Sequence, residues 1–203
     1  MKQHALAIAF GAALCVPPGA RAYEIGFPYY DAVVEMHVNI AGSSPSGARW
    51  NTAFAEAARR WDSDADVRID PVSQYSDPCA GVVPLTVNDP RNGVAFRDDL
   101  CGFSFDEDTL AVTLRMFQLY SDASIVEADI VFNDNVTWDV YDGALRPGRP
   151  DFRRVATHEL GHALGLEHED DVPALMNSAI SGIDAPNDDD QSGVSALYGA
   201  LAA

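Results

Sequence analysis

The spacing of apolar residues changes several times along the chain, and each change marks a predicted element. Residues 32–40 alternate apolar and polar side chains and favour β structure, which predicts a strand. Residues 50–61 carry apolar side chains at intervals of four, four and three, which predicts an amphipathic helix with one stripe in the core. The stripe consists of Trp50, Phe54, Ala58 and Trp61.

The rest of the chain contains further strands, a long irregular stretch and two helices. Residues 67–69 begin a second strand, whereas residues 77–107 are rich in Asp, Gly and Pro and are predicted to form an irregular excursion. Within it, residues 94–96 are a candidate for a short strand. Two strands near 109–117 and 125–133, a helix over about 152–164 and a last helix from about Asp189 to Tyr198 complete the order. Strands first and helices afterwards predict one α+β domain with a mixed sheet.

The first 22 residues have the features of a signal peptide. Lys2 gives a basic start, residues 5–16 form an apolar run, and residues 20–22 read A-R-A, which fits the A-x-A pattern of a cleavage site. The apolar run is too short for a membrane span, and no other stretch of the sequence is long enough. We therefore expect an exported protein, secreted or periplasmic, with no membrane anchor and with residues 23–203 as one folded domain.

The charge of the chain is strongly acidic, with a formal net charge of −18 at pH 7. Loss of Lys2 and Arg21 with the signal would reduce 13 basic residues to 11, all arginine, against 31 acidic residues. Such a surface repels nucleic acid and anionic membranes, so neither is expected as a partner. The charge favours cationic substrates, bound calcium or simply solubility, and solubility is the simpler interpretation. We expect a monomer.

Three cysteines are present, and two of them are predicted to remain in the exported chain. Cys15 lies in the signal and follows Leu14, where a lipoprotein signal would need a small residue, so we expect it to be removed. Cys79 and Cys101 then form an even pair in an oxidising compartment, which predicts a disulfide. The alternative is two free buried thiols.

The residues with the clearest chemistry are 158–168, which read HELGHALGLEH. His158 and His162 are four residues apart, so on a helix both imidazoles leave the same face. Glu159 lies beside the first of them, where it can reach a water molecule on a metal held by the pair. This arrangement is typical of a zinc peptidase in which the glutamate is the general base.

The motif continues beyond the two histidines. Gly165 allows a sharp turn out of the helix because a residue without Cβ adopts a positive φ at little cost. His168 then returns as a third nitrogen ligand, and three protein ligands with a fourth position for water indicate a catalytic zinc site. Met176 follows eight residues later, at the spacing of a Met-turn.

On these residues the chain resembles the metzincins and, within them, the matrixins. Residues 127–133 followed by Trp138 resemble the strand before the zinc helix of microbial matrixins, and residues 110–113 resemble the edge strand before it. The last helix, with Asp189-Asp190 followed by Leu197-Tyr198-Gly199, resembles the end of the matrixin catalytic domain. The resemblance covers about Val33 to Gly199. It implies a metzincin-like domain with a twisted mixed sheet of about five strands, an N-terminal helix, a zinc-binding active-site helix and a C-terminal helix.

The resemblance also implies an activity and a set of site residues. The protein is expected to be a secreted zinc endopeptidase in which a zinc-bound water attacks the peptide bond and Glu159 takes its proton. Met176 would form an apolar floor under the histidines. The polypeptide substrate would bind extended along the edge at residues 110–115, with Leu110, Ala111 and Val112 in contact. Residues 177–181, beginning with Asn177, Ser178 and Ala179, would line the pocket for the side chain after the cleaved bond. Asp189 and Asp190 would steady the Met-turn or the new N-terminus.

The resemblance bears on further metals as well. Animal matrixins carry a second zinc held by histidines, but Val112 and Asp129 stand at matching positions, so we expect one catalytic zinc. Calcium is a second candidate cofactor because acidic residues gather near the last two strands. The alternative is a solvated acidic surface. The acidic residues are Asp122, Glu127, Asp129, Asp134 and Asp139.

Other functions remain to be weighed against the peptidase. A secreted binding module that keeps the fold without activity is the main alternative, and a zinc hydrolase of non-peptide substrates is another. Inactive relatives usually lose the glutamate or a ligand, whereas this chain keeps all four residues. Residues 90–94 echo a cysteine switch with Asn92 in place of the blocking cysteine, which we interpret as coincidence.

Overall fold

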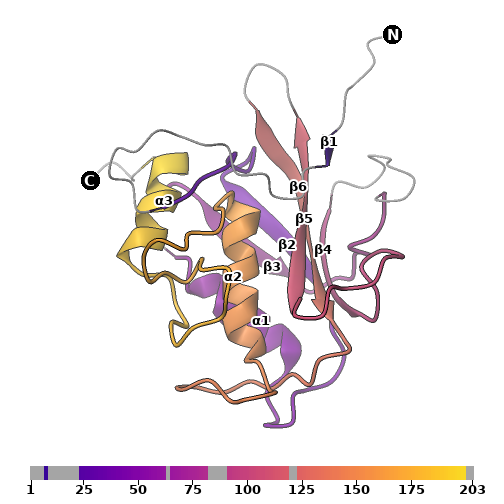
Figure 1. The fold of residues 1–203 in the computed structure, drawn as a ribbon. Coiled ribbons are helices and arrows are strands. Elements are labelled where there is room, and N and C mark those ends of the chain that lie inside the picture. The colour runs from indigo at the N-terminus through magenta and orange to yellow at the C-terminus, as the bar shows by residue number, and fades with distance from the viewer. Residues whose placement is uncertain (1–6, 9–22, 63–64, 82–90, 119–122, 200–203) are drawn as a thin grey trace.

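A computed structural model describes residues 7–8, 23–62, 65–81, 91–118 and 123–199 (Figure 1). Apart from residues 7–8, the predicted signal peptide lies outside the described residues, as does Asp122. The elements are β1 (Ala7–Ile8), β2 (Val33–Val38), α1 (Trp50–Arg59), β3 (Arg68–Val72), β4 (Asn92–Arg97), β5 (Ala111–Gln118), β6 (Ser124–Asn133), α2 (Phe152–Leu164) and α3 (Asp188–Tyr198). Within the described part, no helix is long and apolar enough to cross a membrane.

The sheet is mixed and has the strand order β1-β5-β6-β4-β2-β3. β6, β4, β2 and β3 pair in parallel, whereas β5 runs antiparallel to β6. The two residues of β1 pair only with Met116 and Phe117 in β5. The predicted α+β architecture with about five strands in a mixed sheet is thus confirmed, with β1 as a short addition at one edge.

β4 has a more central place than the sequence indicated. Residues 77–107 were expected to be irregular around a short strand, but β4 lies between β6 and β2 and pairs in parallel with both. The strand begins with Asn92 and Gly93, residue types that are more common in loops than in a central strand. Asn92 is 2% exposed, donates to the main-chain O of Glu35 and accepts a hydrogen bond from the amide of Ala128. A buried side chain with these partners belongs inside a sheet although its type suggests a loop.

The helices α1 and α2 cover one face of the sheet and pack against each other (Figure 1). Phe54, Ala58 and Trp61, from the predicted stripe, are at most 2% exposed. The indole Nε1 of Trp61 donates to the main-chain O of Thr157 at 2.7 Å, which ties the end of α1 to α2. Aromatic side chains fill the space between α2 and the sheet, with ring centroids 4.6 Å to 6.1 Å apart: Trp50, Phe96, Phe132, Trp138 and Phe152.

The last helix is joined to both the site helix and the start of the domain. α3 begins at Asp188, one residue before the predicted start, because Asn187 caps it and forms a capping box with Asp190. At its other end, the hydroxyl of Tyr198 donates to the main-chain O of Leu164 and accepts a hydrogen bond from the amide of Tyr29. This one hydroxyl therefore connects α3, the end of α2 and the segment before β2.

The disulfide expected between Cys79 and Cys101 is present in the structure and closes a loop with a sequence separation of 22 residues around β4. A cross-link of this length stabilises a fold mainly by restricting the unfolded chain. Replacing both cysteines by serine is expected to lower the free energy of unfolding by about 3 kcal/mol. Urea denaturation of the oxidised wild type and the double variant measures the difference. Equal midpoints and equal slopes would contradict the prediction.

A buried carboxyl group in β6 gives a second prediction. Asp129 is 3% exposed, and its Oδ1 accepts a hydrogen bond from the amide of Gly93 at 2.6 Å. Burial raises the pKa of Asp129 well above its usual value, and the neighbouring Glu127 carboxyl adds to the rise. Between the lower pKa of the unfolded chain and the raised pKa of the folded protein, only the folded protein keeps the proton on Asp129. The free energy of unfolding therefore falls as the pH rises through this range.

Asp129→Asn keeps an oxygen acceptor for Gly93 and removes the titration. Relative to wild type, the variant is expected to gain stability as the pH is raised from 5 to 8. In the wild type, folding at the higher pH must either keep a proton on the buried carboxyl group or bury its charge, whereas the asparagine does not titrate. Urea unfolding at both pH values measures this difference, with the exposed Asp134→Asn as a matched control. A stability difference that does not change with pH would sink the idea.

Candidate metal centre and catalytic cleft

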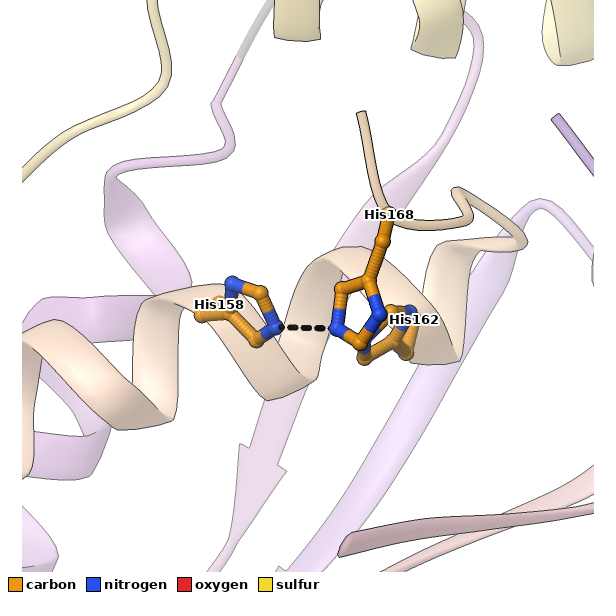
Figure 2. A group of neighbouring side chains, drawn as sticks. All are labelled: His158, His162 and His168. Carbon is orange, nitrogen blue, oxygen red and sulfur yellow. Dashed lines mark hydrogen bonds between the residues drawn. The ribbon is translucent and has the colours of Figure 1, made fainter. Parts of the chain in front are cut away.

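The helix that carries the first two histidines has well-defined ends. At the start of α2, the side chain of Asp151 accepts a hydrogen bond from the amide of Arg153 and caps the helix. At the other end Gly165 adopts φ 101°, the left-handed conformation predicted from the sequence. A Cβ on Gly165 would lie 2.2 Å from the main-chain O of Phe27, so the turn also requires glycine for lack of space. The chain leaves α2 here and turns back toward His158 and His162 (Figure 2).

Three histidine side chains meet as a result (Figure 2). His158 and His162 project from one face of α2, and His168 approaches them from the segment after the helix. The Nε2 atom of His168 lies 3.2 Å from that of His158 and 3.1 Å from that of His162. In a tetrahedral zinc site with Zn–N bonds of 2.0–2.1 Å, ligand nitrogens are about 3.3 Å apart. The spacing of the donors therefore fits a single zinc ion.

Hydrogen bonds at the far side of two rings direct their Nε2 atoms into this space. The Nδ1 atom of His158 lies 2.9 Å from the main-chain O of Leu175, and that of His162 lies 2.8 Å from the main-chain O of Leu166. A carbonyl accepts only, so each Nδ1 carries the proton and each Nε2 presents a lone pair. The Nε2 atoms of His158 and His162 then have no proton to donate to each other. Together with Nε2 of His168 they are better suited to binding one metal ion than to hydrogen bonding among themselves.

The electrostatic surroundings keep the three rings neutral. Burial lowers the pKa of His158, and burial together with His158 and His168 lowers the pKa of His162 well below its usual range. The pKa of His168 is also lowered, by burial and by His158. Because a metal binds the neutral ring, all three shifts favour metal binding.

The carboxylate of Glu159 lies in the same cleft and is 5% exposed. Burial raises the pKa of Glu159 to about 7, although the Thr113 side chain, His168 and Arg115 all act in the opposite direction. A carboxylate with a pKa near neutrality can both take and return a proton at physiological pH.

Met176 is 2% exposed, and its Sδ is the nearest atom to where a Cβ on Gly161 of α2 would lie. Its amide and that of Leu175 donate to the carboxylate of Asp190, at 3.1 Å and 3.0 Å. Asp190 therefore joins the start of α3 to the segment that holds Met176. Asp189 differs, because its Oδ2 is buried and has no hydrogen-bond partner among the described residues. Burial, Asp190 and Glu169 raise the pKa of Asp189 to about 6.

A cavity of about 580 Å³ opens beside the histidines. Of the predicted substrate contacts, Leu110, Ala111, Asn177, Ser178 and Ala179 line it, whereas Val112 is not among its lining residues. Val112 pairs with Val131 of β6, and of its two neighbours along the strand Ala111 lines the cavity, whereas Thr113 does not. Ile180 and Ser181, from the same predicted segment, line it as well. The lining also includes apolar side chains that the sequence did not assign to the pocket: Val155, Leu175 and Ile183.

Two arginines near the site were also missed from the sequence. Arg154 lines the cavity and donates to the main-chain O of Ser181 and of Gly143. Its spacing of four residues from His158 places both on one helical face, which was an available signal. Arg115 is 7% exposed and forms an ion pair of 2.8 Å with Glu167, the residue before His168. No local pattern predicts this contact between residues 52 positions apart.

The four calcium candidates that the structure describes do not belong to the group of histidines that could share an ion. Asp139 accepts hydrogen bonds from the amides of Ser46 and Val140 and pairs with Arg146. Asp129 is bound to Gly93, and Asp134 is exposed at the end of β6. Among the described residues, the three histidines form the one group of His, Cys, Asp or Glu residues close enough to share an ion.

Comparison with known proteins points to one peptidase family. The family model described as Matrixin matches residues 96–199. Interstitial collagenase of Oryctolagus cuniculus is 38% identical over 81 residues, which cover 36% of this chain and 15% of that protein. Hatching enzyme of Paracentrotus lividus is 34% identical over 142 residues, 57% of this chain and 23% of that protein. Matrix metalloproteinase-16 of Homo sapiens is 43% identical over 78 residues, 36% of this chain and 12% of that protein. The chain thus spans less than a quarter of the length of these relatives.

The close packing of Gly161 against Met176 and Trp61 gives a testable prediction. A Cβ on Gly161 would lie 2.4 Å from Sδ of Met176 and 2.8 Å from Cζ2 of Trp61. Gly161→Ala is therefore expected to lower the free energy of unfolding by about 1–3 kcal/mol, the usual effect of overpacking a core. Gly182→Ala is the matched control, because nothing lies within 4 Å of a Cβ there. Chemical denaturation compares the two variants. A Gly161→Ala protein as stable as the control would show that Met176 and Trp61 move to make room for the methyl group.

Proposed function

Because this chain belongs to the matrixin family, we propose that it is a zinc-dependent endopeptidase that cleaves polypeptides. The observation that carries the proposal is the meeting of three imidazole Nε2 atoms beside one buried carboxylate. His158, His162 and His168 would hold the zinc, and Glu159 would act as the general base. Both the donor set and the spacing of the nitrogens support this assignment.

The chemistry divides between the metal and the chain. Zinc, when bound, polarises the scissile carbonyl and makes a water molecule acidic enough to attack near neutral pH. Glu159 would accept the proton of the attacking water and pass it to the amine that leaves. Its buried position and its pKa of about 7 suit both halves of this transfer. Met176 and Asp190 would contribute rigidity under the histidines.

The outer edge of β5 supports an extended substrate. β6 pairs along one side of β5, and on the other side the described residues pair with β5 only at Met116 and Phe117, through β1. Residues 111–115 therefore have an edge at which a polypeptide could pair its main chain, by adding a strand next to the site. The apolar cavity beside Ala111 would take the side chain that follows the cleaved bond.

The pattern of the first 22 residues supports a location outside the cytoplasm. We propose that residues 1–22 direct export and that residues 23–203 act outside the cytoplasm as a monomeric peptidase. The disulfide between Cys79 and Cys101 suits an oxidising compartment. An inactive binding module would have no use for a buried carboxylate beside three converging histidines, so no observation favours that alternative.

The proposal predicts a specific pattern for Glu159→Ala. Wild type and variant are both expected to contain about one zinc per chain, measured by mass spectrometry, because the glutamate is not a ligand. Cleavage of casein should fall at least about 100-fold in the variant, the lower range of general base catalysis. A chelator should abolish cleavage by the wild type, and added zinc should restore it.

His162→Ala separates metal binding from proton transfer. It is expected to lose both zinc and activity, since one of three protein ligands is gone. If the wild type binds stoichiometric zinc but cleaves neither casein nor a broad peptide library, the endopeptidase proposal is overturned. Activity that persists in Glu159→Ala would mean that another group takes the proton.

A further inference from the structure

Thr113 contacts the proposed general base from the neighbouring strand. It lies in β5, opposite Ile130 of β6, and its side chain is directed at α2. Its Oγ1 is 2.6 Å from Oε2 of Glu159 and 3.1 Å from the main-chain O of the same residue. The two residues are 46 positions apart in the chain. The contact therefore results from the packing of α2 on β5.

The single hydroxyl proton of Thr113 can be donated to only one of these oxygens at a time. The carboxylate is the stronger acceptor, and the shorter distance of 2.6 Å is typical of a hydroxyl bound to an ionised carboxylate. Donation to Oε2 leaves Oε1 of Glu159 without this partner. One oxygen is thus anchored to the strand, where the main chain of Thr113 also interacts with the carboxylate, and the other would receive the proton of a water molecule.

A free glutamate side chain would occupy several rotamers, so its carboxylate needs an anchor to stay in one position. We propose that Thr113 is a positioning residue of the peptidase, whose hydroxyl holds the Glu159 carboxylate in the orientation that receives the proton of the attacking water. This inference rests on the proposed function of Glu159.

The place of Thr113 in β5 extends its role beyond one hydrogen bond. Residues 111–115 of the same strand form the edge at which the substrate main chain would pair. The anchor of the base and the anchor of the substrate are then neighbours on one rigid strand. A strand is more precise than a loop as a support for a catalytic group. The distance between the proton acceptor and the scissile bond would therefore be set by β5.

Two substitutions separate the hydroxyl from the shape of the side chain. Thr113→Val keeps a β-branched side chain of similar volume and removes the donor, whereas Thr113→Ser keeps the donor and removes a methyl group. Thr137→Val is a matched control, because it removes an exposed hydroxyl that does not line the cleft. For each full-length protein, kcat and KM are measured on a fluorogenic peptide that the wild type cleaves, with zinc content and thermal midpoint.

Thr113→Val is expected to lower kcat about 10- to 100-fold, the effect of losing one hydrogen bond to a charged group. KM and zinc content should stay near the wild-type values, since neither substrate pairing nor the ligands change. Thr113→Ser should regain most of kcat. Wild-type kcat in the valine variant would overturn the inference. A serine variant as slow as the valine variant, or losses that follow the thermal midpoint or zinc content in both, would indicate mere packing and overturn it too.

Crystal structures of wild type and Thr113→Val give a readout that does not depend on activity. The Glu159 carboxylate is expected to turn away from its wild-type position in the variant. An unmoved carboxylate would overturn the inference even if the peptidase proposal holds. A wild type that cleaves no peptide would refute the peptidase, whereas the comparison of structures would still show whether Thr113 sets the position of Glu159.

Discussion

The left-handed turn at Gly165 is the constraint on which the site depends. A helix can align His158 and His162 by itself, but a third nitrogen reaches them only if the chain reverses immediately after the helix. Gly165 makes the reversal possible with φ 101°, and the space beside it is filled by the main-chain O of Phe27. The amide of Gly26 donates to the main-chain O of Gly165 at 2.8 Å. The segment before β2 thus packs against the turn and holds it in place.

A second chain of contacts connects α3 to His158. The carboxylate of Asp190 accepts from the amides of Leu175 and Met176 and also closes the capping box of α3 with Asn187. The main-chain O of Leu175 in turn accepts a hydrogen bond from Nδ1 of His158. One carboxylate therefore connects the start of a helix, the Met-turn and the orientation of a proposed ligand. A buried network whose members have partners fixes geometry more strongly than its separate bonds would.

The sequence predicted those features that depend on local geometry. The interval between His158 and His162, the turn at Gly165 and the apolar stripe of α1 all follow from helical periodicity and the conformational freedom of glycine. The central place of β4 could not be predicted in this way, because its partners in β2 and β6 are about 40 to 60 residues away in the chain, as the contacts of Asn92 at separations of 57 and 36 residues illustrate. Thr113 was missed for the same reason, since its contact with Glu159 depends on how a helix packs on a strand.

The buried cation Arg115 connects the two proton equilibria of the site. Burial is the main influence on both: it raises the pKa of Glu159 and lowers the pKa of His162. Arg115 opposes burial at the carboxyl group, whose charged form it attracts, and reinforces burial at the imidazole, whose charged form it repels. The same guanidinium thus favours both the form of Glu159 that accepts a proton and the form of His162 that binds a metal. Its ion pair with Glu167, the residue before His168, holds that charge in position, so an apparently structural contact also contributes to the electrostatics of the site.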